Sequence, residues 1–158
     1  MSRTKQPSKK RPRTRPKRHL NPWDASKDLS VIRGNWMQEP APLEPGVKFF
    51  VLMLEQIGCW TEFSCEGHPG GFYITFYGSE ATARIIAECD GFFYVALSGN
   101  GNDGYCLRLH ANECGHAATD QPWDTKTRDF CLRHTATAWV KRFGPLRSEG
   151  PVEGGKGQ

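Results

Sequence analysis

Residues 61–76 read TEFSCEGHPGGFYITF, two strand-like runs on either side of a turn rich in glycine and proline. In the first run Thr61, Phe63 and Cys65 alternate with polar residues, and residues 72–77 alternate in the second. Alternation with a period of two is typical of a strand with one buried face, and glycine and proline supply the backbone angles of a tight turn. The stretch therefore predicts two paired strands, with Cys65 and His68 at the turn between them.

The rest of the chain predicts helices and a second strand pair around this hairpin. The expected elements, in chain order, are a helix from Pro45 to Gly58, strands at 60–65 and 72–77, a helix from Ser79 to Gly91, strands at 92–97 and 104–110, and a long helix at about 124–143. Two hairpins separated by a helix favour a layered structure with an antiparallel sheet. We therefore expect an α+β fold in a single domain, with a mainly antiparallel four-stranded sheet and helices packed on one face.

Outside this domain the composition changes. The expected organisation is a disordered basic arm at 1–18, an irregular strap at 19–44, the α+β domain at 45–143 and a flexible tail at 144–158. Trp23 and Trp36 are too apolar for a free linker, so we expect them to hold the strap over the domain.

The charge is divided unevenly along the chain. The whole sequence has a net charge of +4, but residues 1–18 hold nine Lys and Arg and no acid, which leaves 12 bases and 17 acids elsewhere. A basic arm on an acidic body is typical of phosphate binding, to nucleic acid or less often to anionic lipid. A tail that only raises solubility is the alternative. The residues expected to bind nucleic acid here are Arg11, Arg13, Arg15, Lys17 and Arg18.

The sequence gives no sign of a membrane segment. No apolar run approaches the roughly 18 residues of a membrane-spanning helix, and the basic start lacks the apolar core of a signal peptide. We expect a cytoplasmic protein with no membrane partner, in which the six cysteines are thiols or metal ligands.

The second face of the predicted sheet carries side chains that are typical of a binding surface. Phe72, Ile74 and Phe76 and their counterparts in the later strands are expected to face the helices. The opposite face then presents Tyr73, Thr75, Tyr77, Tyr94, Cys106, Arg108 and His110. Aromatic rings beside Arg and His on an open sheet are typical of proteins that stack the bases of single-stranded nucleic acid. Alternatively, tyrosine is present only as a good strand former, and the strap or the last helix covers the face.

Soft metal ligands occur in two pairs with the spacing Cys-x-x-His. Cys65 and His68 lie in the turn, and Cys131 and His134 lie one helical turn apart in the last helix. Zinc takes four such donors, so the two pairs together predict a zinc site. The alternative is that the cysteines are core residues, since cysteine is among the most buried residue types.

The same turn also permits catalysis. A thiol beside an imidazole can act as a nucleophile or an acid–base pair, with Cys65 and His68 in these roles and Glu66 or Glu62 orienting the imidazole. The alternative is that Gly67, Pro69, Gly70 and Gly71 shape a tight reversal and the side chains only support it.

The motif Thr-x-Phe-Ser-Cys-Glu-Gly-His at 61–68 resembles proteins of bacterial plasmids and phages that carry a Ser-Cys-x-Gly-His turn after a helix. More distantly it is similar to the Ser-Ser-Cys-Ser-Gly-Arg turn of the tRNA wybutosine-synthesis methyltransferase family, which uses S-adenosylmethionine. The likeness covers residues 47–77 only. In the second comparison Ser64, Cys65 and Gly67 match, whereas Phe63, Glu66 and His68 depart from the pattern. The first resemblance implies an accessory role in a mobile element and no particular activity.

Together these observations predict a nucleic-acid-associated accessory protein of a bacterial mobile element, with the Cys/His turn at its functional centre. A small RNA- or nucleotide-modifying enzyme that uses the same turn is an alternative. A decoy that binds a host protein through the acidic body is another. The sequence alone does not decide whether the protein is an enzyme.

Overall fold

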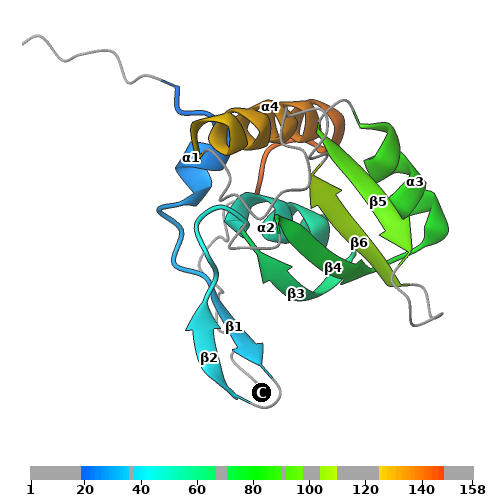
Figure 1. Cartoon of the computed structure of the whole chain (residues 1–158), viewed down its shortest axis with the longest axis horizontal. Coiled ribbons are helices and arrows are strands. Elements are labelled where there is room, and N and C mark those ends of the chain that lie inside the picture. The colour runs from blue at the N-terminus through cyan, green and yellow to red at the C-terminus, as the bar shows by residue number, and fades with distance from the viewer. Residues whose placement is uncertain are drawn as a thin grey trace, which may run out of the picture.

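The computed structural model describes residues 19–35, 38–66, 71–89, 92–97, 104–109 and 125–147 (Figure 1). The elements are α1 (Pro22–Ser26), β1 (Ile32–Asn35), β2 (Gln38–Pro42), α2 (Lys48–Gln56), β3 (Trp60–Cys65), β4 (Tyr73–Tyr77), α3 (Glu80–Glu88), β5 (Phe93–Leu97), β6 (Gly104–Leu109) and α4 (Thr125–Phe143). From α2 to α4 this is the predicted order of helices and strands. The predicted basic arm at 1–18 lies outside the described residues.

The central element is a four-stranded sheet with the strand order β3-β4-β6-β5. Every neighbouring pair in it is antiparallel. The chain crosses from β4 to β5 through α3, and this crossover leaves room for β6 between them. The prediction of an α+β fold with a four-stranded antiparallel sheet is confirmed.

One face of the sheet packs against α2 and α4, and we call it the inner face. The ring of Phe50 in α2 meets Phe72, Phe93 and Trp139 edge-on, with ring centroids 5.8, 4.8 and 5.2 Å apart. Edge-to-face contacts of this kind add to the stabilisation from burial alone. The sheet residues expected to face the helices are buried here, apart from Val95 and Leu97, which are half-buried. They are Phe72, Ile74, Phe76, Phe93, Tyr105, Leu107 and Leu109.

The third helix of the layer, α3, is capped by Ser79, the residue at which the sequence predicted its start. Ser79 accepts a hydrogen bond from the backbone N–H of Thr82 at 3.1 Å, which satisfies one of the free donors at the helix start. Ala83 and Ile86 are the buried residues of α3. The small side chain of Ala83 allows the helix to lie close to β5, and Ile86 fills the core beside it.

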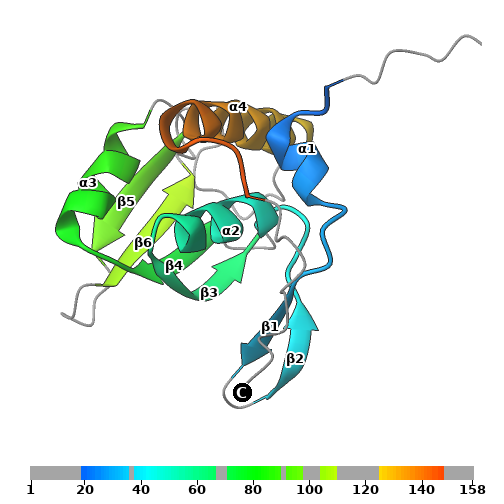
Figure 2. The same ribbon diagram turned by 180° about the vertical axis from the view of Figure 1, so that it is seen from behind.

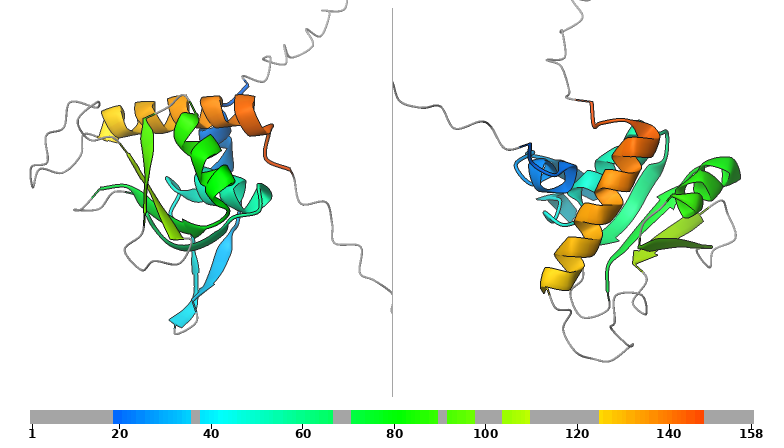
Figure 3. Two further views of the ribbon diagram at one scale, coloured as in Figure 1. Left: turned by 90° about the vertical axis from the view of Figure 1, so that its right-hand side faces the viewer. Right: turned by 90° about the horizontal axis from the view of Figure 1, so that it is seen from above.

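The segment predicted as an irregular strap contains regular structure instead. It forms α1 and the antiparallel hairpin β1–β2, which extends away from the rest of the protein in Figures 1 and 2 and on the left of Figure 3. Trp23 is fully buried and its indole N–H donates to the carbonyl of Gly46 at 3.0 Å. Trp23 thus packs as predicted, and the domain begins well before Pro45. Trp36 lies outside the described residues.

The start of the predicted flexible tail is also ordered by contacts. Gly144 has a positive φ of 85° and ends α4, with its N–H donating to the carbonyl of Val140 at 2.8 Å. The side chain of Gln56 then binds the carbonyl of Pro145 at 3.0 Å and the N–H of Arg147 at 2.8 Å. Residues 144–147 are therefore held against α2, and the remainder of the predicted tail lies outside the described residues. Among the described helices, none is long and apolar enough to span a bilayer.

Candidate nucleic-acid interface

The face of the sheet opposite the helices carries a set of exposed aromatic side chains, and we call it the outer face. The strand register arranges its residues in three rows across the strands. The rows are Trp60, Tyr77 and Gly104; then Phe63, Thr75, Cys106 and Ala96; and then Cys65, Tyr73, Arg108 and Tyr94. The alternation of the sequence had predicted that Tyr73, Tyr77 and Arg108 share a face, and the register places them on one.

These rings are unusually open to solvent. Trp60 is 56% exposed, Phe63 is 55% exposed and Tyr94 is 38% exposed, while Tyr73 and Tyr77 are half-buried. The described helices thus leave this face uncovered, and three large apolar rings stand on it in water. Exposed large aromatic side chains that share one face of a sheet indicate a binding surface more strongly than singly scattered ones do. The alternative in which the last helix covers the face does not hold for the described residues.

A β-bulge in β3 decides which residues reach the outer face. Thr61 pairs with Phe76 but Phe63 pairs with Thr75, so one extra residue, Glu62, is accommodated between them. The register shift turns Thr61 toward the core, where it is 3% exposed, and keeps Phe63 on the outer face. The expectation that Thr61, Phe63 and Cys65 share one side is therefore wrong for Thr61.

The extra residue also organises one end of the face. The carboxylate of Glu62 accepts a hydrogen bond from the phenol of Tyr77 at 2.9 Å, and this bond raises the pKa of Tyr77. Tyr77 packs beside Trp60, with ring centroids 5.8 Å apart and planes inclined by 35°. Trp60 and Tyr77 thus form a fixed aromatic pair at the edge of the sheet.

The middle of the outer face has small side chains. Thr75, Cys106 and Ala96 lie in one row beyond Phe63. The hydroxyl of Thr75 accepts from the backbone N–H of Phe63 at 3.0 Å, which holds β3 against β4 next to the bulge. Cys106 is buried in this row, whereas Thr75 and Ala96 are half-buried.

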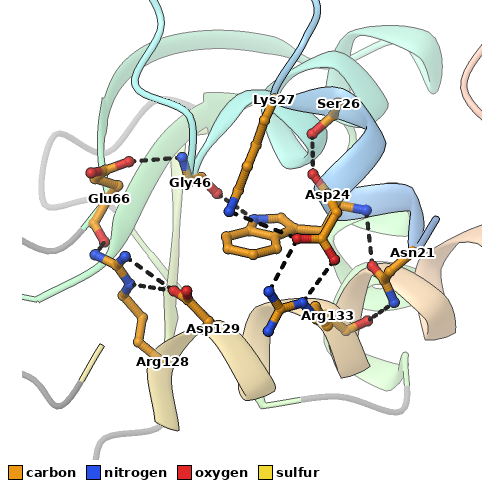
Figure 4. Close-up of polar contacts among 10 residues, drawn as sticks. Asn21, Asp24, Ser26, Lys27, Gly46, Glu66, Arg128, Asp129 and Arg133 are labelled. Carbon is orange, nitrogen blue, oxygen red and sulfur yellow. Dashed lines mark hydrogen bonds and ion pairs between the residues drawn. The ribbon is translucent and has the colours of Figure 1, made fainter. Parts of the chain in front are cut away.

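Cys65 and Glu66 lie at the end of β3, and Glu66 forms hydrogen bonds to three residues distant in the sequence. Its carboxylate accepts from the N–H of Gly46 at 2.7 Å (Figure 4). Its own N–H donates to the carboxylate of Glu44 at 2.7 Å. Arg128 of α4 donates to the carbonyl of Glu66 at 3.5 Å. These contacts fix the root of the predicted catalytic turn and favour an anchoring role for Glu66. Cys65 is half-buried in the row of Tyr73, and His68 lies outside the described residues.

The second predicted metal pair does not form a common site in the part of the chain that is described. Cys131 is 1% exposed in the core, whereas His134 is exposed on the surface. The imidazole of His134 lies 5.2 Å from the ring of Phe92 and 6.4 Å from that of Phe130. Within the described ranges, no three His, Cys, Asp or Glu residues gather as metal ligands would. Cys131 thus behaves as the core residue that the alternative predicted, and the zinc hypothesis gains no support.

The start of the described chain is fixed to α4. The carboxylate of Asp24 accepts two hydrogen bonds from Arg133, at 2.8 and 3.1 Å, and Asn21 donates to the carbonyl of Arg133 at 3.3 Å (Figure 4). The bond from Arg133 lowers the pKa of Asp24. Lys27 lies 3.5 Å above the ring of Trp23 and adds a cation–π contact. The described chain therefore begins in the helical layer, beside α1 and α4, and not on the outer face of the sheet.

Two members of the outer face were not identified as site residues from the sequence. Trp60 and Phe63 were assigned to a strand, but only the pairing of β3 with β4 shows that both side chains point away from the core. The signal available was the density of aromatics between residues 60 and 77. Of the other predicted residues, the arm residues and His110 lie outside the described chain.

Comparison of the chain with protein-family models, with curated proteins and with solved structures gives no match. The resemblances of the 61–68 motif therefore stay predictions.

Proposed function

We propose that this protein binds single-stranded nucleic acid, with bases stacked on the outer face of the sheet and phosphates held by the N-terminal arm. The observation that carries the proposal is the exposure of Trp60, Phe63 and Tyr94 on one uncovered sheet face. Every base has a face that stacks on an aromatic ring, so such a surface is tolerant of sequence. The stacked faces of a duplex are closed to such rings, so a single strand is the form that fits.

The charge distribution supports different roles for the two parts, with base stacking on the outer face and phosphate binding by the arm. The face holds Arg108 and the acid Glu62, so in its described part it contributes little net positive charge. The arm holds nine cations, and 18 residues span at most about 60 Å when extended. A folded chain of this length has a radius of gyration of about 15 Å. From its root on α4 the arm is thus long enough to reach a strand that lies on the far face.

The proposal is tested by fluorescence anisotropy with a labelled oligonucleotide, single-stranded and annealed to its complement. We expect tighter binding of the single strand. Tyr73→Ala should weaken single-strand binding by about 1–3 kcal/mol, because one stacking ring is lost. Equal affinity for both forms, or no effect of Tyr73→Ala, would contradict stacking on this face.

A second variant tests the arm. Replacing Arg11, Arg13, Arg15, Lys17 and Arg18 with Gln removes five charges from the full chain. Each lost phosphate contact reduces the slope of log affinity against log salt by about 0.7 for a single strand. We expect the slope to flatten by up to about 3.5, and an unchanged slope would show that the arm does not contact the phosphates.

The accessory role in a bacterial mobile element rests on the resemblance of the 61–68 motif and stays a prediction.

A further inference from the structure

We propose that Tyr73, Arg108 and Tyr94 form a dinucleotide subsite, in which two neighbouring bases stack on the tyrosines and Arg108 holds the phosphate that joins them. The inference rests on the proposed function and deepens it, because it assigns a repeating unit of the ligand to three named side chains. It makes Arg108 a binding residue rather than a solvated surface charge.

The pairing register of β4, β6 and β5 determines the geometry of this subsite. Arg108 of β6 is the direct partner of Tyr73 on β4 and of Tyr94 on β5. All three side chains therefore leave the same face of the sheet in one row, with the cation between the two rings. Neighbouring strands lie about 4.8 Å apart, so the backbones that carry the two tyrosines are about 10 Å apart.

This spacing selects the kind of ligand. Successive bases in a duplex strand are stacked about 3.4 Å apart, which is too close for each to cover a different tyrosine. Two bases on Tyr73 and Tyr94 have to be unstacked and spread apart. A flexible single strand allows this arrangement, and its linking phosphate then lies over the middle of the row, where Arg108 is placed.

Arg108 differs from three other arginines, each of which is held by a carboxylate. Arg84 is paired with Glu80 at 2.6 Å, Arg128 with Asp129 at 3.1 Å and Arg133 with Asp24 at 2.8 Å. Arg108 is exposed, and within the described ranges no carboxylate pairs with it. A guanidinium presents a planar fork of donors that matches a phosphate.

The acidic residue of the outer face, Glu62, already binds another side chain. Glu62 lies toward the opposite end of the face and accepts the hydrogen bond from Tyr77. The other members of the row of Arg108 are Cys65 and the two tyrosines, none of which is an acid that would compete with a phosphate. The row therefore combines two rings with a cation that no described carboxylate neutralises.

The test compares Arg108→Gln, Arg108→Lys and the control Arg84→Gln in the full chain, with a ten-nucleotide thymidine strand over a series of salt concentrations. If Arg108 holds a phosphate, Arg108→Gln should weaken binding and reduce the salt slope by about 0.7. Arg108→Lys should keep the wild-type slope because the charge remains. Arg84→Gln removes an arginine from the helical layer and should change neither quantity. Tyr94→Ala should weaken binding about 5- to 150-fold through the lost stack.

The outcomes separate this inference from the proposed function. If Arg108→Gln keeps the wild-type slope while Tyr73→Ala and Tyr94→Ala weaken binding, the face binds a strand but Arg108 does not hold its phosphate. If the wild type does not bind the strand at any salt concentration, the proposed function itself fails. Circular dichroism of each variant confirms that it is folded. If Arg108→Gln does not fold, Arg108→Lys still tests the site through affinity, because lysine lacks the planar fork of donors: weaker binding at the wild-type slope is expected, and wild-type affinity would overturn the role of Arg108.

Discussion

Replacing Phe63 with alanine should impair binding far more than folding. The side chain is 55% exposed, so somewhat less than half of its surface is removed from water in the fold. Full burial of a phenylalanine stabilises a protein by about 1.5–3 kcal/mol, so Phe63→Ala should cost only about 1 kcal/mol of unfolding free energy. For a domain of this size that corresponds to a fall in Tm of about 4 °C.

The same substitution should have a larger effect on the affinity for the ligand. Loss of one stacked base should cost about 1–3 kcal/mol, which is about a 5- to 150-fold rise in Kd for a single-stranded oligonucleotide. The two quantities are measured by thermal denaturation and by fluorescence anisotropy on the same preparation. Phe50→Ala provides the contrast, since Phe50 is fully buried and its loss should cost about 3–5 kcal/mol of stability.

Phe130→Ala is the matched control for Phe63→Ala. Phe130 is 62% exposed, but it lies on α4 and not on the sheet. Its removal should lower stability by a similarly small amount and leave the Kd unchanged. The reasoning is refuted if Phe63→Ala unfolds the protein like Phe50→Ala, or if it binds the oligonucleotide as tightly as the wild type.

Three further predictions concern the contacts around the interface. Gly46→Ala should destabilise the fold by about 1–3 kcal/mol, because a Cβ there would lie 2.9 Å from the Cβ and a carboxylate oxygen of Glu66. Urea denaturation measures this, and the loss caused by Gly46→Ala should be smaller in a Glu66→Gly background, which lacks both clashing atoms, if the clash is its cause. Asp24→Asn should lower stability at neutral pH. Because its folded-state pKa is lowered by Arg133, the contribution of Asp24 is complete above the ordinary aspartate pKa of about 3.9 and is lost as the pH falls through the lower folded value. The stabilities of Asp24→Asn and wild type should converge in acid, and a constant difference down to pH 2 would contradict the ion pair. A chelator should leave the Tm of the wild type unchanged, since Cys131 is buried and His134 is exposed, and a marked fall in Tm would revive the zinc hypothesis.

The sequence was sufficient for the sheet because alternation is a local property. Phe72, Ile74 and Phe76 had to face one way if residues 72–77 formed a strand, and this placed Tyr73 and Tyr77 on the other side. The start of α3 could also be predicted, because the capping contact of Ser79 is local.

Features that depend on contacts between residues far apart in the sequence could not be predicted from it. The bulge at Glu62 exists because β3 pairs with β4 in a shifted register, and that shift separates Thr61 from Phe63. Glu66 was interpreted as a catalytic neighbour of His68, yet its contacts are to Gly46, Glu44 and Arg128, which are 20 or more positions away in the chain. Periodicity in the sequence indicates local structure, and it does not indicate contacts between residues that are so far apart in the chain.

The segment before the domain was misjudged for the same reason. α1 has five residues, too short to be stable alone, and it is held by Asp24, Asn21 and Trp23 against α4 and Gly46. Short elements that depend on tertiary contacts leave a weak pattern in the sequence. Their composition, rich in proline and polar residues, was therefore taken for irregular structure.

The most direct test of the central claim is a nuclear magnetic resonance titration of the ¹⁵N-labelled full chain with an unlabelled single-stranded oligonucleotide. If bases stack on the outer face, ring currents should shift the amide resonances of the sheet around the exposed rings, and the indole resonance of Trp60 should move with them. The indole resonances of Trp23 in α1 and Trp139 in α4, which are buried in the core, should stay in place. Shifts confined to the arm and to the helical layer, with the Trp60 indole unmoved, would contradict the claim that the sheet binds the strand.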